Sequence, residues 1–217
     1  MPANQIAKGE ADASREQPHQ HPELPWREQE RLADEFVTGL EKLTSDRAAL
    51  ARLKRCSGRS LAECPDVYPI FYRLLPGRAR GRSRLEDTFF LTATLFPLFP
   101  QKGQGDLGAS LGKFVVRNPR FAAGVERRLG ILLDSGPEDL PFRLRQVVVL
   151  LASHDIGTDW RQLTVDLLQW KRSSRTTHKR WARSFFGTDD TTAASSLAKA
   201  ERDEPTEDTD TVTDPAE

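Results

Sequence analysis

Between residues 26 and 186, apolar residues recur at the spacing of an amphipathic helix, not at the alternating spacing of a strand. Leu32, Phe36, Leu40 and Leu43 fall at positions i, i+4, i+8 and i+11, so they share one helical face. We expect this stripe to be buried against other helices while the charged positions stay in water. The pattern predicts an all-α fold.

Similar stripes predict further helices along the chain. We place them at residues 45–55, 67–75, 85–98, 119–132, 139–151, 159–170 and 175–185, with another segment resuming at 109 after a glycine-rich break. Ser45, Asn118 and either Thr158 or Asp159 are the expected N-caps, since their side chains can accept a free backbone N–H. The run Val147–Val149 is also compatible with a strand, because β-branched residues favour extended backbone.

The two ends of the chain differ from this core in composition. Residues 1–25 are rich in Pro, His, Gln and acids, and residues 187–217 consist mostly of Thr, Asp, Glu, Ala and Pro. Segments with so little to bury are typically disordered. We therefore predict a disordered head (1–25), one all-helical domain (26–186) and an acidic disordered tail (187–217). The length of the domain suits compact helical bundles formed by its N-terminal and C-terminal halves.

The formal net charge of +0 conceals a strong separation of charge. Residues 1–30 hold three basic and six acidic residues, and residues 187–217 hold two basic and ten acidic residues. Residues 31–186 hold 27 basic against 16 acidic residues, a net charge of +11. A basic core of this kind attracts polyanions, above all the phosphate backbone of nucleic acids.

Thirteen basic residues on the predicted helices are candidate phosphate contacts. They are Arg52, Lys54, Arg55, Lys113, Arg117, Arg120, Arg127, Arg128, Arg143, Arg145, Arg172, Lys179 and Arg183. Any one of them alone is better explained as a solvated side chain or an ion-pair partner, but the excess of charge favours nucleic acid for the set. The arginine-rich loop 78–84 is interpreted as a solvated loop and not as a minor-groove hook.

Aromatic residues offer a second way to hold a strand, by stacking on bases. Phe71, Tyr72, Trp160, Trp170 and Trp181 are the candidates, but they lie at helical spacing with other apolar residues. We therefore assign them to the core.

No catalytic, metal or cofactor site is predicted. The histidines and cysteines lack the spacing of metal motifs, and the chain has no nucleophile elbow and no P-loop. Asp159 and Asp166 lie two turns apart on one predicted helix, where capping explains Asp159 and an ion pair explains Asp166. Cys56 and Cys64 are too few for a disulfide scaffold, and no apolar run is long enough for a signal or a membrane span. We expect a cytoplasmic protein without membrane contact.

Several short blocks, taken in order, are similar to a known family. They are Ser45-Asp46-Arg47-Ala48-Ala49-Leu50 with Arg52-Leu53-Lys54-Arg55, Ile70-Phe71-Tyr72-Arg73-Leu74-Leu75, Ser110-Leu111-Gly112-Lys113, Arg127-Arg128, Leu144-Arg145, Thr158-Asp159-Trp160, Asp166-Leu167, Trp170, and Arg180-Trp181-Ala182-Arg183-Ser184-Phe185-Phe186. In this order they resemble CasB, the small subunit of the type I-E CRISPR surveillance complex Cascade. The resemblance covers about residues 45–186.

This resemblance implies an all-helical subunit with no nuclease activity of its own. It implies that two copies stack along the inner face of the complex beside other Cascade subunits. It also implies contact with the CRISPR RNA (crRNA), the target heteroduplex and the displaced DNA strand, in antiviral defence.

Two other functions are compatible with the residues themselves. A free-standing helical regulator would bind duplex DNA through a helix in the major groove and show sequence preference. A scaffold protein would use its basic faces on acidic subunits and bind no nucleic acid.

Overall fold

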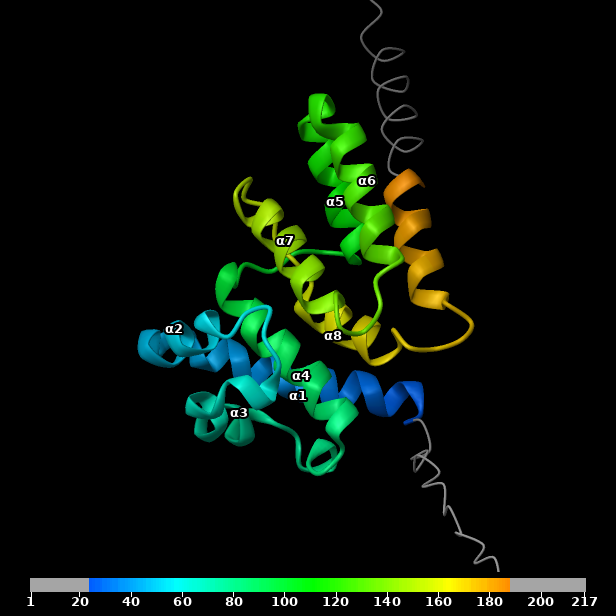
Figure 1. Cartoon of the computed structure of the whole chain (residues 1–217). Helices are drawn as coiled ribbons and strands as arrows, with labels where there is room; N and C mark the ends of the chain where they lie inside the picture. Colours follow the sequence, from blue (N-terminus) through cyan, green and yellow to red (C-terminus); the bar gives the residue numbers. More distant parts are fainter. Residues whose placement is uncertain (1–23, 188–217) are drawn as a thin grey trace, which may run out of the picture.

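The computed structural model describes residues 24–187, which form helices joined by short turns (Figure 1). The helices are α1 (Trp26–Lys42), α2 (Arg47–Arg55), α3 (Tyr68–Leu74), α4 (Ser83–Leu95), α5 (Leu107–Arg117), α6 (Ala122–Leu133), α7 (Leu140–Ala152), α8 (Trp160–Leu168) and a last helix over residues 176–187. Helical turns of the 3-10 type cover Leu43–Ser45, Leu61–Glu63, Pro65–Val67, Gly77–Ala79, Phe96–Leu98 and Pro119–Phe121. The predicted all-α fold is confirmed, and the β-branched run Val147–Val149 lies in α7. The disorder predicted for the head and tail concerns residues that lie almost entirely outside this described range.

The helices are arranged in two connected groups. In the view of Figure 1, α1 to α4 form the lower group, α5, α6 and helix 176–187 form the upper group, and α7 and α8 lie between them. Helix α8 packs on α1 and α4, while α7 contacts α4, α5 and α6. Helix α8, from late in the sequence, therefore packs on the lower group, and α7 connects the lower group to the upper one.

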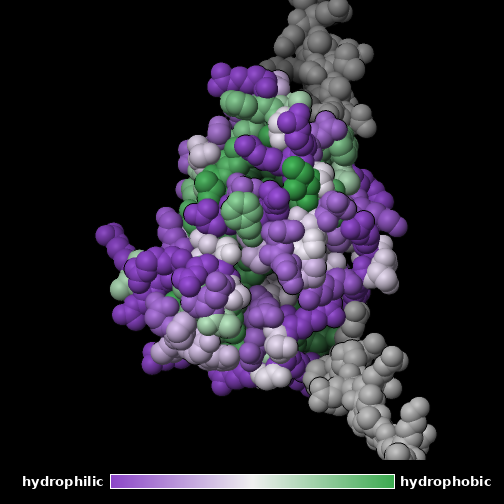
Figure 2. All heavy atoms as spheres, in the orientation of Figure 1, coloured by the Kyte–Doolittle hydropathy of each residue, from purple (hydrophilic) through white to green (hydrophobic). Residues whose placement is uncertain are grey.

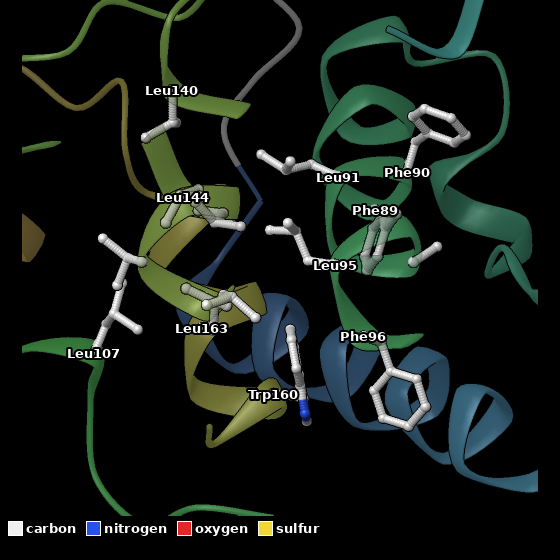
Figure 3. Packing of buried hydrophobic residues seen from close by; sticks show 14 of the residues in the cluster. Phe89, Phe90, Leu91, Leu95, Phe96, Leu107, Leu140, Leu144, Trp160 and Leu163 are labelled. Atoms are coloured by element: carbon white, nitrogen blue, oxygen red, sulfur yellow. The ribbon is translucent and has the colours of Figure 1, made fainter. Parts of the chain in front are cut away.

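The core is continuous across this junction (Figure 3). Leu95 points from α4 toward Leu144 of α7, Trp160 of α8 lies below it in this view, and the ring centroids of Trp160 and Phe96 are 5.5 Å apart. Leu144 of α7 is fully buried on the other side. Since burying a large apolar side chain contributes roughly 1.5–3 kcal/mol, this shared core holds α4, α7 and α8 together.

Two of the expected helix starts differ in detail. The N-cap of α2 is Asp46 and not Ser45, because the Asp46 carboxylate accepts the Ala49 N–H at 2.9 Å. Asn118 makes no cap hydrogen bond with its side chain, and its amide Nδ2 instead donates to the Phe114 carbonyl oxygen at 3.1 Å. Of the two residues proposed for the start of α8, Asp159 is the cap, accepting the Gln162 N–H at 3.0 Å.

The glycine-rich break before α5 is shorter than the sequence indicates. Helix α5 begins at Leu107, after the Asp106 cap, so Gly108 lies inside its first turn. A Cβ atom at Gly108 would lie 2.0 Å from the Trp181 carbonyl oxygen of helix 176–187. This glycine is part of a helix crossing that only a residue without a side chain allows.

Candidate nucleic-acid interface

Helix α2 presents a basic surface because it buries only two side chains, which lie one turn apart on the same side. Ala49 and Leu53 are buried, whereas Arg52, Lys54 and Arg55 are exposed in the last turn. Cations at a helix C-terminus are favoured by the helix dipole, so the three charges fit this position without an acidic partner. The long side chains leave their charged ends in water, where a phosphate can reach them.

A fourth predicted residue comes to this surface from α7. Arg145 Nε donates a hydrogen bond to Ser57 Oγ at 3.1 Å, across 88 positions of sequence. Gly58, with φ of +86°, lies so close that a Cβ there would be 3.3 Å from Arg145 Cδ. Arg145 is thus held beside the turn that follows Lys54 and Arg55. We name these four residues, Arg52, Lys54, Arg55 and Arg145, the α2 cluster.

A second set of predicted residues lies on the upper helices. Lys113 and Arg117 are one turn apart on α5, Arg127 and Arg128 lie on α6, and Arg120 lies in the turn between these helices. Helix 176–187, with Lys179 and Arg183, lies beside α6 in Figure 1. The Arg175 guanidinium, just before it, donates to the carbonyl oxygen of Leu133 at 3.5 Å and so fixes where it starts. We name these seven residues, Lys113, Arg117, Arg120, Arg127, Arg128, Lys179 and Arg183, the distal basic group.

Two of the thirteen candidates belong to neither set. The Arg143 guanidinium is half-buried and lies 5.5 Å from the centroid of the Phe142 ring, as a cation–π contact. Arg172 is half-buried in the turn between α8 and the last helix. Arg120 also lies over a ring, 4.7 Å from the Phe121 centroid, but it is exposed, whereas the half-buried Arg143 and Arg172 are less available to a phosphate.

The α2 cluster and the distal basic group differ from several other basic residues because they form no ion pair with an acid of the described range. Arg31, Arg78, Lys102, Arg161 and Arg180 form ion pairs with acids of the described range. None of these belongs to the α2 cluster or the distal basic group. In the described part of the chain, both sets therefore keep their charge uncompensated by a neighbouring carboxylate, which is what a polyanion site requires.

Sequence reasoning did not find the most buried charge network. Asp166 is fully buried on α8, where the Trp181 indole N–H donates to its Oδ2 at 2.5 Å and the Gln162 amide donates to its Oδ1 at 2.7 Å. The Arg180 guanidinium also binds this carboxylate and reaches Asp106 at 3.6 Å. The expected ion pair of Asp166 is confirmed, and it ties α8 to the last helix. Its partner Arg180 stands 14 positions away, outside the spacings that pair side chains on one helix.

The aromatic candidates for base stacking are mostly core residues, as expected. Phe71, Trp160, Trp170 and Trp181 are buried, and Tyr72 is half-buried with its hydroxyl donating to Glu86 at 3.2 Å. The arginine-rich loop 78–84 is largely exposed, but two of its arginines contact other parts of the protein. Arg78 pairs with Glu28 at 2.8 Å, and the Arg80 guanidinium donates to the Tyr72 carbonyl oxygen at 2.7 Å. These contacts use the loop's arginines for packing.

Two side chains that could carry chemistry, Cys56 and His178, are buried. Burial raises the pKa of the Cys56 thiol to about 12, which keeps it protonated and unreactive at neutral pH. Burial lowers the pKa of His178, whose ring lies 4.0 Å from that of Trp170. Within residues 24–187, no group of three or more His, Cys, Asp or Glu side chains is arranged to hold a metal ion, and no helix is long and apolar enough to cross a membrane.

Comparison with known proteins relates this geometry to one family. Residues 49–186 match the family of CRISPR-associated protein Cse2. The chain is 32% identical over 157 residues to a CRISPR-associated protein Cse2 of Thermus thermophilus, covering 71% of this chain and 89% of that protein. Its fold is similar to the crystal structure of CasB from Thermus thermophilus, with a TM-score of 0.62 and 28% identity over 71% of this chain and 97% of that one. A chain of a solved CRISPR RNA-guided surveillance complex shares the fold, with a TM-score of 0.66 and 20% identity over 77% of this chain and 99% of that one.

Proposed function

Because this chain belongs to the CRISPR-associated Cse2 family, we propose that it is the non-catalytic small subunit of a type I-E CRISPR surveillance complex, Cascade. In this role it binds crRNA and target DNA and stabilises the displaced strand in antiviral defence. The observation that carries the proposal is the α2 cluster, in which Lys54 and Arg55 of one helix and Arg145 of another lie together without an acidic partner. The predicted domain, residues 26–186, would supply these contacts in the cytoplasm.

The mechanism is electrostatic and independent of sequence. Lysine and arginine side chains make charge-assisted hydrogen bonds to phosphate oxygens and release condensed counterions. Such contacts position a strand without identifying its bases. Formation of the RNA–DNA heteroduplex is nearly balanced in free energy against the duplex it replaces, so contacts of about 1 kcal/mol each shift the equilibrium.

A place in a larger assembly is supported by exposed apolar residues of α6 and α7. Figure 2 shows apolar side chains gathered on the face over α5, α6 and α7. Ile131 of α6 and Phe142 and Val149 of α7 are between 42% and 48% exposed, and apolar side chains that gather on one face are typical of a protein-contact surface. We assign this face to contact with other Cascade subunits. Two copies of the chain stack beside one another in the proposed complex.

The test is binding of a fluorescent single-stranded DNA followed by anisotropy over a range of salt concentrations. Replacing Lys54 and Arg55 together, or Arg145 alone, with Ala should weaken binding and leave the helical circular dichroism unchanged. The slope of log K against log salt should become shallower by about 0.7 for each lost phosphate contact. The control is Arg31→Ala, which removes the same charge from an ion pair on α1 and should leave the slope unchanged.

Either of two results would contradict the proposal. If the slope is the same in the α2-cluster variants and in Arg31→Ala, these residues do not contact phosphate. If the protein prefers one duplex sequence and binds it without partners, the free-standing regulator is the better account.

A further inference from the structure

The distal basic group lies on helices that carry almost no acidic residues. Residues 107–133 and 176–187 together hold eight basic residues and one acidic residue, Glu126. Arg180 is the only one of the eight that is occupied by carboxylates within the described part of the chain, through Asp106 and Asp166. The other seven basic residues are exposed and form no ion pair with an acid of the described range.

The sequence directly after this surface has the opposite charge. Residues 188–217 contain ten acidic and two basic residues, a net charge of −8 in 30 positions. Arg183 lies four residues before Gly187, roughly 6 Å along the helix axis. At about 3.3 Å per extended residue, 30 residues can span up to ~100 Å, which exceeds the length of α5 and α6. The acidic segment thus starts beside the basic surface and is long enough to cover it.

We propose that residues 188–217 bind the distal basic group of their own chain and compete there with nucleic acid. The competition rests on the proposed function, whereas the contact between tail and helices does not. Carboxylates pair with guanidinium groups as phosphates do, but they lack the dense counterion layer that strengthens binding to nucleic acid.

Tethering makes such a contact effective although each pair is weak. An exposed ion pair contributes about 0–1 kcal/mol, and salt screens it. A segment attached to its own binding surface is present at a millimolar effective concentration, so even weak contacts are populated. The free subunit would then resist non-specific nucleic acid, and a strand held by several subunits of an assembly would displace the tail.

The first experiment tests the contact without nucleic acid. The full-length protein is treated with a carbodiimide, which joins carboxylates directly to nearby lysine amines, and the linked peptides are identified by mass spectrometry. At low salt the tail carboxylates should be joined to Lys113 and Lys179, and these products should disappear at about 0.5 M salt. Lys42 of α1, Lys54 of α2 and Lys102, in the segment before α5, provide the matched control. Tail products spread evenly over all these lysines, or absent, would overturn the proposal.

A mixing experiment separates the tail of the same chain from that of a second copy. Equal amounts of ¹⁵N-labelled and unlabelled protein are combined before cross-linking. Products should contain only one kind of label. Products that join labelled to unlabelled peptides would show that the tail binds a neighbouring chain, and would overturn the intramolecular contact.

The second experiment tests the competition. One full-length variant replaces the ten tail acids with Asn and Gln, and a control variant keeps all ten but reverses the order of residues 188–217. If the tail occupies its surface about nine-tenths of the time, the neutral variant should bind single-stranded DNA about tenfold more tightly at low salt. The reversed variant should bind as the natural chain does. Equal affinity of the neutral variant and the natural chain would overturn the competition, while DNA binding by neither would count against the proposed function and leave the cross-links as the test of the contact.

Discussion

Asp166 is the residue on which the junction of α8 and the last helix depends most. Its carboxylate is fully buried and receives hydrogen bonds from Trp181 and Gln162 as well as the Arg180 ion pair. A buried carboxylate is favourable only when such partners satisfy it. Removing its charge would leave the donors without a full acceptor and Arg180 with only the more distant carboxylate of Asp106, at 3.6 Å.

Asp166→Asn should therefore lower the free energy of unfolding by about 2–4 kcal/mol. This loss of unfolding free energy should be smaller than the largest losses known for fully buried ion pairs, because the Arg180 side chain is 41% exposed. Urea denaturation followed by circular dichroism measures this. Asp34→Asn is the control, since its pair with Arg161 is exposed and should be worth less than about 1 kcal/mol. Equal effects of the two substitutions would contradict the importance assigned to the buried network.

Glu28 gives a prediction about pH. Hydrogen bonds from Arg31 and Arg78 lower the pKa of this carboxyl to about 2 from its ordinary value of 4.5. Because the folded pKa lies below the unfolded one, the stabilisation is fully present above pH 4.5 and is lost as the pH falls towards 2. The difference in unfolding free energy between the natural protein and Glu28→Gln should shrink over that interval. A difference that does not change with pH would show that the two arginines do not hold the carboxylate.

At the scale of elements, the crossing of α5 and the last helix depends on a single missing side chain. Gly108 faces the Trp181 backbone, and a Cβ there would lie 2.0 Å from a carbonyl oxygen that cannot rotate away. Gly108→Ala should destabilise the fold by at least about 3 kcal/mol, because a helix and not a flexible side chain must move. Thermal and urea denaturation measure the loss.

Gly124 on α6 is the matched control for this substitution. Nothing lies within 4 Å of a Cβ at this position, so Gly124→Ala should stabilise the protein by about 0.5–1 kcal/mol through helix propensity. If both substitutions destabilise the protein by a similar amount, the close crossing of the two helices is not the reason why position 108 requires glycine.

Much of the element structure was predictable because the apolar spacing is local information. The helices, the cap at Asp159 and the core assignment of Trp181 all follow from residues within a few turns. The predicted N-cap of α2, Ser45, was wrong by one position. Ser45 and Asp46 can both accept a backbone N–H, and the apolar spacing does not distinguish between them.

Contacts between distant elements were not predictable in the same way. The hydrogen bond from Arg145 to Ser57 joins positions 88 residues apart, and it decides that these charges act on one surface. The pairing of Asp166 with Arg180 likewise depends on how the last helix crosses α8. The sequence indicates thirteen candidate basic residues, but it does not show which of them lie together. Their division into the α2 cluster and the distal basic group depends on how the helices pack.

At the scale of the whole molecule, charge and fold are arranged for contact with large partners. The described residues carry 28 basic and 18 acidic side chains, and the helices of the distal basic group also expose apolar side chains, among them Val116, Ile131 and Phe186. A surface that combines both suits a subunit that meets a nucleic-acid backbone and other proteins together. We therefore expect the protein to function in an assembly and not as an isolated chain.

The most direct measurement of this central claim is purification of the tagged, full-length protein from its native host, followed by nuclease treatment and gel analysis of what accompanies it. We expect a small RNA of uniform length together with several proteins in unequal amounts. A pure protein without RNA and without partners would contradict it, and would favour a helical DNA-binding regulator that acts alone.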